Sequence, residues 1–184
     1  STSPTGRRSA SPSTPTPAPQ TAEERLQAYV AQMPVEDKIG QLCMFGFSGT
    51  GGVSDAFAAI LSQYRIGNVI LYGSNIVRTN GDGGFAQCAA LTADINAHNA
   101  TGVPLLISTD VEGGNVTRFK WPSWPTHAAT LGSRGDTERA REQFAMIGGG
   151  LVSVGINTDL APVMDVARDP EATFLGKRII SSDA

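Results

Sequence analysis

Short apolar runs alternate with longer amphipathic segments along most of this chain, and this alternation constrains the fold more than any other feature. The runs cover residues 42–47, 67–73, 104–110 and 156–162. Each is short enough for a β-strand, and a run without polar alternation, such as that at 104–110, is typical of strands covered on both faces. Four strand-then-helix units in series predict a parallel sheet with right-handed crossovers.

Capping residues mark where the helices around these strands should begin. Thr21 and Glu24 form a capping box for a first helix, and Pro34 opens a second helix whose first turn is acidic. Ser54 and Asp136 are suitable N-caps for two later helices. A further helix is expected where three apolar residues lie near one face, Phe85, Cys88 and Ile95.

This series of strands and helices is compatible with two architectures. They are an open doubly wound sheet and a (β/α)8 barrel of which the chain forms the first half. The loop after the first strand, GFSGTGGVS at residues 46–54, is rich in glycine like a nucleotide cradle. A dinucleotide pattern starting at Gly49 and Gly51 would need a third glycine where the chain has Ser54, and no lysine follows as in a P-loop. We therefore expect a flexible strand-to-helix connection there, and both architectures stay open.

Composition limits the classes of partner. The chain has 184 residues, of which 40% are hydrophobic, so it is long enough for one domain with a core and too short for two large ones. Its net charge is -3 and its 14 Lys and Arg are scattered, which argues against a nucleic-acid partner. No apolar run approaches the roughly 18–20 residues needed to cross a bilayer, so no membrane span is expected.

The two cysteines, Cys43 and Cys88, lack the short spacing of a zinc or redox pair. Two buried free thiols are the expected arrangement. A disulfide is the alternative, and it would fit an exported protein.

The beginning of the chain has the composition of a linker. Fifteen of the first 21 residues are Ser, Thr or Pro, and such a segment cannot bury enough apolar surface to offset its chain entropy. We predict a disordered tail over residues 1–20 and a folded domain over residues 21–184. Because such linkers often tether exported domains, we expect a cell-surface or extracellular protein. A lipoprotein after processing is one form that such an exported protein could take, and a cytoplasmic protein is the alternative.

Acids and arginines follow the third and fourth predicted strands. Asp110 and Glu112 come directly after the third strand with Arg118 close behind, and Asp165 and Arg178 come after the fourth. In a barrel these strand ends share one mouth. Carboxylates accept hydrogen bonds from hydroxyls and guanidinium groups donate several, so the set suits a neutral polyhydroxylated ligand such as a sugar. The alternative is that Asp110 and Arg118 only pair with each other to hold a long loop.

Five segments in a fixed order resemble one known family. They are MPVEDKIGQL, PLLISTDVEGGNVTR, LGSRGD, GINTDLAPVMDV and GKRIISSD. From about Met33 to its last residue the chain is similar to the N-terminal domain of glycoside hydrolase family 3. The motif DVEGG, in place of Asp-x-x-His-Gly, favours the β-N-acetylhexosaminidase branch of the family over its β-glucosidase branch. The resemblance implies a (β/α)8 TIM-barrel fold, of which the chain holds the first four or so units.

The resemblance also implies roles for individual residues. Asp110 matches the aspartate that binds the outer hydroxyls of the terminal sugar, and Arg118 matches the arginine that reaches the same ring. Arg178 matches the arginine of an Arg-Ser-Phe motif, although two isoleucines follow it here. Asp165 is expected at the mouth of the site in a structural or ligand-orienting role. Glu112 is expected to be a hydrogen-bond acceptor that stabilises the loop.

No catalytic residue is assigned within the chain. The family's Lys-His motif, its His-Asp acid/base pair and its nucleophilic aspartate belong to later strands, and none of these motifs occurs in the 184 residues. His98 and His127 lack the required neighbours and are expected to be ordinary surface or loop histidines. The resemblance implies a retaining glycosidase that removes terminal β-linked N-acetylglucosamine from peptidoglycan fragments or chitooligosaccharides, without a metal or organic cofactor.

Other functions stay open from the sequence. One is a β-glucosidase-type hydrolase of the same family, and another is a non-catalytic glycan-binding derivative of the fold. An aldolase-type barrel would need a Schiff-base lysine in a strand, but Lys38, Lys120 and Lys177 all lie outside the predicted strands.

Overall fold

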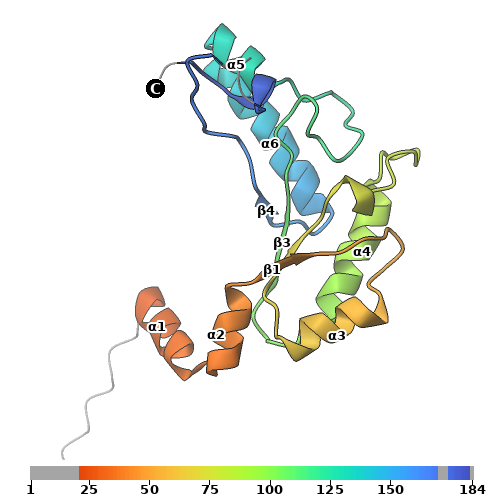
Figure 1. Ribbon diagram of the computed structural model, residues 1–184, viewed down its shortest axis with the longest axis vertical. Coiled ribbons are helices and arrows are strands. Elements are labelled where there is room, and N and C mark those ends of the chain that lie inside the picture. Colours follow the sequence, from red (N-terminus) through yellow and green to blue (C-terminus); the bar gives the residue numbers. More distant parts are fainter. Residues whose placement is uncertain (1–20, 170–173, 183–184) are drawn as a thin grey trace, which may run out of the picture. The chain divides into compact units, whose positions relative to one another are not determined.

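The computed structural model describes residues 21–169 and 174–182. The chain separates into two units, residues 1–33 and 34–184. In the first unit, α1 (Ala22–Gln32) begins at Thr21, whose hydroxyl accepts a hydrogen bond from the Glu24 N–H at 3.1 Å (Figure 1). The Glu24 carboxylate accepts one from the Thr21 N–H at 2.7 Å, so the predicted capping box is confirmed. The predicted tail, residues 1–20, lies outside the described residues.

The second unit contains a parallel sheet of four strands, β1 (Met44–Gly46), β2 (Asn68–Ile70), β3 (Leu106–Thr109) and β4 (Thr158–Asp159), in the order β1-β2-β3-β4 (Figure 1). Every strand lies within a predicted run. Each strand also pairs with its predecessor in the chain, whereas a doubly wound sheet reverses its order at a switch point. The strand order therefore confirms the barrel-type fold over these four units and excludes the open alternative.

α2 (Val35–Gln41) precedes β1, and the strands are separated by α3 (Asp55–Gln63), α4 (Phe85–Ala97), α5 (Ala128–Arg134) and α6 (Thr137–Ser153). Two short 3-10 helices are η1 (Gly73–Asn75), after β2, and η3 (Gly176–Arg178), after β4. The predicted caps are confirmed at Ser54, which accepts from the Phe57 N–H at 3.3 Å, and at Asp136, which accepts from the Arg139 N–H at 2.9 Å. α5, η1 and η3 were not predicted, because helices of seven and three residues are too short to show an apolar period. α2 has the same length as α5, but Pro34 and an acidic first turn mark its start, and α5 has neither signal.

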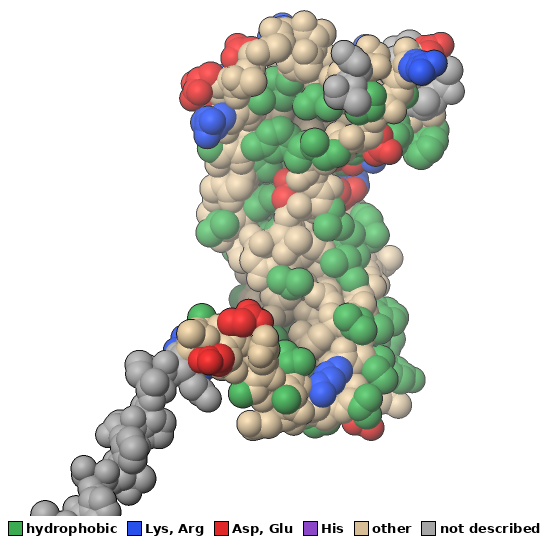
Figure 2. Space-filling model, turned by 90° about the vertical axis from the view of Figure 1, so that its left-hand side faces the viewer, with side chains coloured by type: hydrophobic (Ala, Val, Ile, Leu, Met, Phe, Trp, Pro, Cys, Tyr) green, Lys and Arg blue, Asp and Glu red, His purple; other side chains and the backbone are tan. Residues whose placement is uncertain are grey.

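The core lies on one face of the sheet. Its buried side chains include Val69, Leu71, Leu105 and Ile107 from or beside the strands, Phe57 and Leu61 from α3, Cys88, Leu91 and Ile95 from α4, and Ile147 and Leu151 from α6. Leu106 points away from this cluster and is 48% exposed. The expected cover on both faces of β3 is therefore wrong at Leu106 within the described residues. Hydrophobic side chains also reach the surface at many points of the face drawn in Figure 2.

Side-chain amides join elements that are distant in sequence. The Asn157 amide accepts from the Ile107 N–H at 2.9 Å and donates to the Leu105 carbonyl at 2.8 Å, which extends the pairing of β3 with β4. Asn75 donates to the carbonyls of Phe47 and Gly49 at 3.0 and 2.9 Å. The glycine-rich loop after β1 is thus a connection fixed by the side chain of a neighbouring loop.

Both cysteines are free thiols, which excludes the disulfide alternative. Cys88 is buried, and this burial raises the pKa of its thiol to about 12. Cys43 is only half-buried, since it precedes β1 at the edge of the sheet. Within residues 21–169 and 174–182, no helix is long and apolar enough to cross a bilayer, and no group of His, Cys, Asp and Glu side chains could hold a metal ion.

Candidate functional site

The loop that follows β3 turns sharply at its glycine pair. The N–H groups of Glu112 and Gly113 both donate to the Val116 carbonyl, at 2.8 and 3.1 Å. Gly113 and Gly114 have φ values of +93° and +57°, in the region that side chains rarely adopt. A Cβ on Gly113 would collide with the Thr126 carbonyl, and one on Gly114 with the His127 ring. The two glycines therefore supply both the turn and the close approach to residues 126–127.

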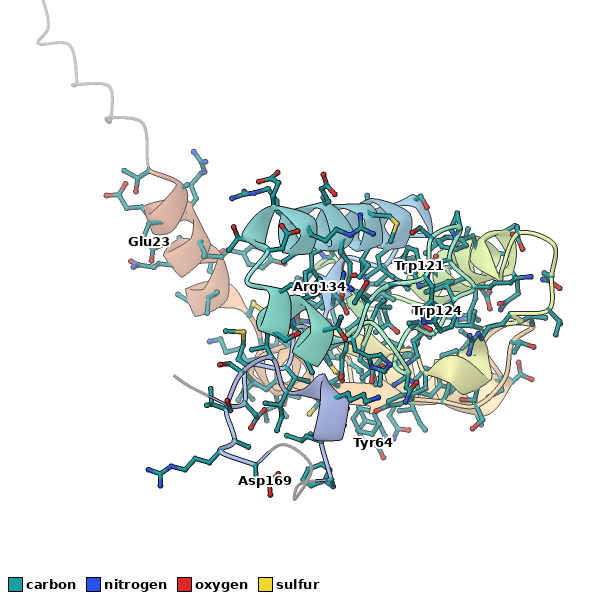
Figure 3. The ribbon with its side chains drawn as sticks, turned by 90° about the horizontal axis from the view of Figure 1, so that it is seen from above. Glu23, Tyr64, Trp121, Trp124, Arg134 and Asp169 are labelled. Atoms are coloured by element: carbon teal, nitrogen blue, oxygen red, sulfur yellow. The ribbon has the colours of Figure 1, made fainter. Side chains whose placement is uncertain are left out.

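Aromatic and amide contacts anchor the far part of this loop. The Trp121 ring lies 5.2 Å from that of Phe85 on α4 and 5.8 Å from that of Phe119, between ring centroids (Figure 3). The Gln143 amide of α6 accepts from the Thr126 N–H at 2.7 Å and donates to its carbonyl at 3.1 Å. The loop is thus held at several points, and it presents its charged residues from a fixed backbone.

Asp110 and Arg118 form a two-pronged ion pair at the carboxyl end of β3. The Arg118 Nε donates to Asp110 Oδ1 at 2.7 Å, and its Nη2 donates to Oδ2. The two side chains stay 21% and 23% exposed. Arg118 also has a φ of +53°, which is uncommon for a residue other than glycine. The pairing that the sequence left as an alternative therefore exists, and it leaves part of both groups accessible.

Glu112 and Arg178 form a second pair of the same geometry. The Arg178 Nε donates to Glu112 Oε2 at 2.7 Å, and its Nη2 donates to Oε1 at 2.6 Å. The Glu112 side chain is 5% exposed and that of Arg178 is 37% exposed. The hydrogen bonds to Glu112 raise the pKa of Arg178, and the charges of Asp110 and Asp165 act in the same direction. Glu112 is an acceptor, as expected, but its partner is 66 positions away.

The five acids and arginines that the sequence analysis named are therefore linked to one another at the carboxyl end of β3. Asp110 binds Arg118, and Glu112, two positions further on, binds Arg178. Asp165 is exposed and acts on Arg178 through its charge. His98 lies elsewhere, at the end of α4 and 3.8 Å from Asp94, whereas His127 precedes α5 and its ring lies against Gly114 of the loop after β3.

Asp159 is a further member of this group that the sequence reading missed. It ends β4, and its Oδ1 accepts from the Val111 N–H at 2.8 Å, directly between Asp110 and Glu112. Burial raises the pKa of Asp159 to about 6; the Val111 hydrogen bond opposes this rise, and the negative charges of Asp110 and Glu112 add to it. The sequence did contain a hint of this role, because Asp159 lies inside the predicted strand at 156–162. An acid within a strand must either be exposed to water or accept hydrogen bonds from other groups.

Replacing Asp159 by Asn is expected to stabilise the protein in a pH-dependent way. The folded-state pKa lies above the ordinary value of 3.8, so the charged carboxylate costs stability above pH 6, and this cost disappears as the pH falls toward 3.8. Asn keeps the acceptor for Val111 without the charge. Well above pH 6, the Asn variant should melt roughly 2–4 °C higher than the unchanged protein, the shift that about 1 kcal/mol produces.

Thermal unfolding measured across this pH range tests the prediction. The difference in melting temperature should close as the pH approaches 3.8. The control is Asp136→Asn at the start of α6, an exposed cap where Asn serves as well as Asp. A stabilisation that is equal at every pH, or that grows on acidification, would contradict the expected role of Asp159.

Comparisons with known proteins show the family of this chain. Residues 34–184 match the family model described as the glycosyl hydrolase family 3 N-terminal domain. The beta-hexosaminidase LpqI of Mycobacterium tuberculosis (strain ATCC 25618 / H37Rv) is 29% identical over 178 residues, which are 95% of this chain and 42% of the relative. An uncharacterized secreted glycosyl hydrolase of Arthroderma benhamiae is 30% identical over 140 residues, 74% of this chain and 37% of the relative.

A solved structure shows the same fold. It is that of a glycoside hydrolase family 3 beta-N-acetylglucosaminidase from Paenibacillus sp. str. FPU-7, which matches with a TM-score of 0.70 at 34% identity. The match covers 80% of this chain and 27% of that one. The chain thus spans less than half the length of each of these relatives.

Proposed function

The chain belongs to glycosyl hydrolase family 3, and on that basis we propose that it is the sugar-binding N-terminal part of a retaining glycosidase. The whole protein would remove terminal β-linked N-acetylglucosamine from peptidoglycan fragments or chitooligosaccharides, in the carbohydrate metabolism of a cell wall. The names of two relatives, a beta-hexosaminidase and a beta-N-acetylglucosaminidase, support this choice of sugar.

The observation that carries the proposal is the double ion pair at the end of β3. Each arginine uses its Nε and Nη2 to bind a carboxylate, at Asp110 and at Glu112. The Nη1 atoms of Arg118 and Arg178 can still donate, and the carboxylate oxygens have further lone pairs. Because each charge already has an opposite partner, the array suits the hydroxyl groups of a neutral sugar better than a charged ligand.

In this proposal Asp110 and Arg118 bind the outer hydroxyls of the sugar, Arg178 reaches the same ring, and Asp165 orients the ligand at the mouth of the site. Retention needs a nucleophile at the anomeric carbon, an acid for the leaving oxygen and a water that releases the intermediate. The family's motifs for those steps do not occur in the 184 residues. The part of this chain is to hold and orient the substrate, without a metal or organic cofactor.

An exported location belongs to the same proposal. The Ser/Thr/Pro-rich start of the chain has the composition of a tether, and one relative is named a secreted glycosyl hydrolase.

Hydrolysis of chromogenic glycosides tests the function. The whole protein should release the chromophore from a β-N-acetylglucosaminide with a higher kcat/KM than from the matching β-glucoside. The 184-residue chain alone should show no turnover of either, because it lacks the motifs for the nucleophile and the acid/base. A preference for the β-glucoside would move the protein to the other branch of the family. Sugar binding by the whole protein without hydrolysis of any glycoside would identify a glycan-binding derivative instead.

A further inference from the structure

Tyr72 lies beside the Asp110–Arg118 pair and has no role in the function proposed so far. It follows β2, and the register pairs Ile70 with Ser108 on β3. Continuing that register by two residues places Tyr72 level with Asp110. The Leu71 N–H donates to the Ser108 carbonyl at 2.8 Å, so the strands stay paired beyond the end of β2. Tyr72 and Asp110 therefore share the carboxyl end of the sheet.

The Tyr72 ring also meets Arg118. The guanidinium carbon lies 6.0 Å from the ring centroid, at the outer limit of a cation–π contact. At this separation the contact covers little of the ring, and Tyr72 remains 45% exposed. A large aromatic side chain that is left this accessible next to a polar cluster is typical of ligand sites, which combine apolar surface with a few placed polar groups.

Buried contacts hold Tyr72 in place. Its N–H donates to the Oδ1 of Asn75 at 2.9 Å, and Asn75 is fully buried and bonded to the loop after β1. Gly46 at the end of β1 leaves room for the ring, since a Cβ there would stand 3.0 Å from the Tyr72 Cε2. The backbone of Tyr72 is thus fixed and its ring rests against Gly46, which lowers the conformational entropy lost when a ligand packs against the ring.

We propose that Tyr72 is a specificity-determining residue that packs against the C–H face of the sugar whose hydroxyls bind Asp110 and Arg118. This inference rests on the proposed function. A pyranose has polar groups around its rim and C–H groups on its faces, and weakly positive C–H groups are attracted to the negative face of an aromatic ring. Asp110 and Arg118 supply the polar contacts of such a site, and Tyr72 supplies an apolar surface at the same level.

Kinetics of the whole protein with a β-N-acetylglucosaminide test the proposal. Tyr72→Leu should raise KM about tenfold with kcat and melting temperature little changed, because a ring–sugar contact is of that size. Tyr72→Phe keeps the ring and should restore KM. The control is Tyr64→Leu, an exposed tyrosine at the end of α3 (Figure 3). An unchanged KM in Tyr72→Leu, in a protein whose unchanged form hydrolyses the substrate, would overturn the role of Tyr72 and leave the proposed function standing.

A double substitution separates direct contact from support of Arg118. If Tyr72 only holds Arg118 in place, Tyr72→Leu should have no further effect in an Arg118→Ala protein. If the ring itself binds the sugar, KM should rise about tenfold in that background too. Loss of the effect in the double variant would overturn the inference. If the unchanged protein neither binds nor hydrolyses the glycoside, the proposed function is wrong, and the inference about Tyr72 falls with it.

Discussion

Replacing Asp110 by Ala in the whole protein is expected to lower kcat/KM for a β-N-acetylglucosaminide roughly 30- to 1000-fold, which corresponds to about 2–4 kcal/mol of lost transition-state binding. A carboxylate that accepts hydrogen bonds from sugar hydroxyls leaves them unpaired when it is removed. The Asp110 side chain is 21% exposed, so it is accessible to a ligand and yet partly shielded from water. Near-normal kcat/KM would refute the assignment of Asp110 to the sugar site.

The ion pair with Arg118 adds a second expectation for the same variant. Removing the carboxylate leaves the guanidinium, 23% exposed, without its partner. Leaving such a group unpaired costs about 1–3 kcal/mol, so the melting temperature of Asp110→Ala should fall as well. Stability and activity are then both lost, and a single variant cannot tell which loss causes the other.

Removing both partners resolves this. Taking away both members of a hydrogen-bonded pair is often nearly neutral for stability, because no group is left unsatisfied. The double variant with Ala at positions 110 and 118 should therefore melt close to the unchanged protein, while its kcat/KM stays low. Recovery of activity together with stability would show that Asp110 and Arg118 only support the loop. Glu142→Ala is the matched control: its pair with Arg139, at 3.3 Å, is exposed and should affect neither quantity.

Features that depend on neighbouring residues could be predicted from the sequence. The caps at Thr21, Ser54 and Asp136 each form a hydrogen bond within three positions, so the residue types alone indicate them. The strands fall within the predicted apolar runs for a similar reason, since hydrophobic pattern and length are local properties. The end of the apolar run at 104–110 likewise placed Asp110 and Glu112 at the end of a strand, and the family resemblance added expected roles.

Features that depend on distant segments could not be predicted. The role of Asp159 arises only when β4 pairs with β3 and brings its carboxylate to the Val111 N–H, 48 positions away. α5 contains Gly132, a poor helix former. A Cβ on Gly132 would collide with the Ile180 carbonyl, so this helix is shaped by a contact with the segment after η3. Neither contact leaves a periodic pattern in the sequence.

The Glu112–Arg178 pair gives rise to the largest expected effect on stability. Breaking a buried ion pair by removing one partner costs about 3–5 kcal/mol, because the remaining charge is uncompensated. Here the two partners differ in burial: the Glu112 side chain is 5% exposed and that of Arg178 is 37% exposed. The cost should therefore depend on which partner is removed.

Arg178→Ala leaves the carboxylate of Glu112 buried and unpaired, and its free energy of unfolding should fall by about 3–5 kcal/mol. Glu112→Ala leaves Arg178, which can turn toward water because it is more than one-third exposed, so its cost should be smaller. Denaturant unfolding of the whole protein, with both single variants and the double variant, measures this asymmetry. The double variant should be more stable than Arg178→Ala, since it removes the stranded carboxylate together with its partner.

The direction of the asymmetry decides what the pair does. If Glu112→Ala lowers the free energy of unfolding as much as Arg178→Ala does, the expected asymmetry is wrong. Glu112 would then contribute to stability through the turn at Gly113 rather than through its charge. If the order is as expected, the buried carboxylate is the anchor and the guanidinium is the accessible end of the pair. In that arrangement the buried Glu112 carboxylate binds the Nε and Nη2 of Arg178 and so fixes the plane of its guanidinium group. The remaining nitrogen, Nη1, is then held in a position where it can donate to a ligand.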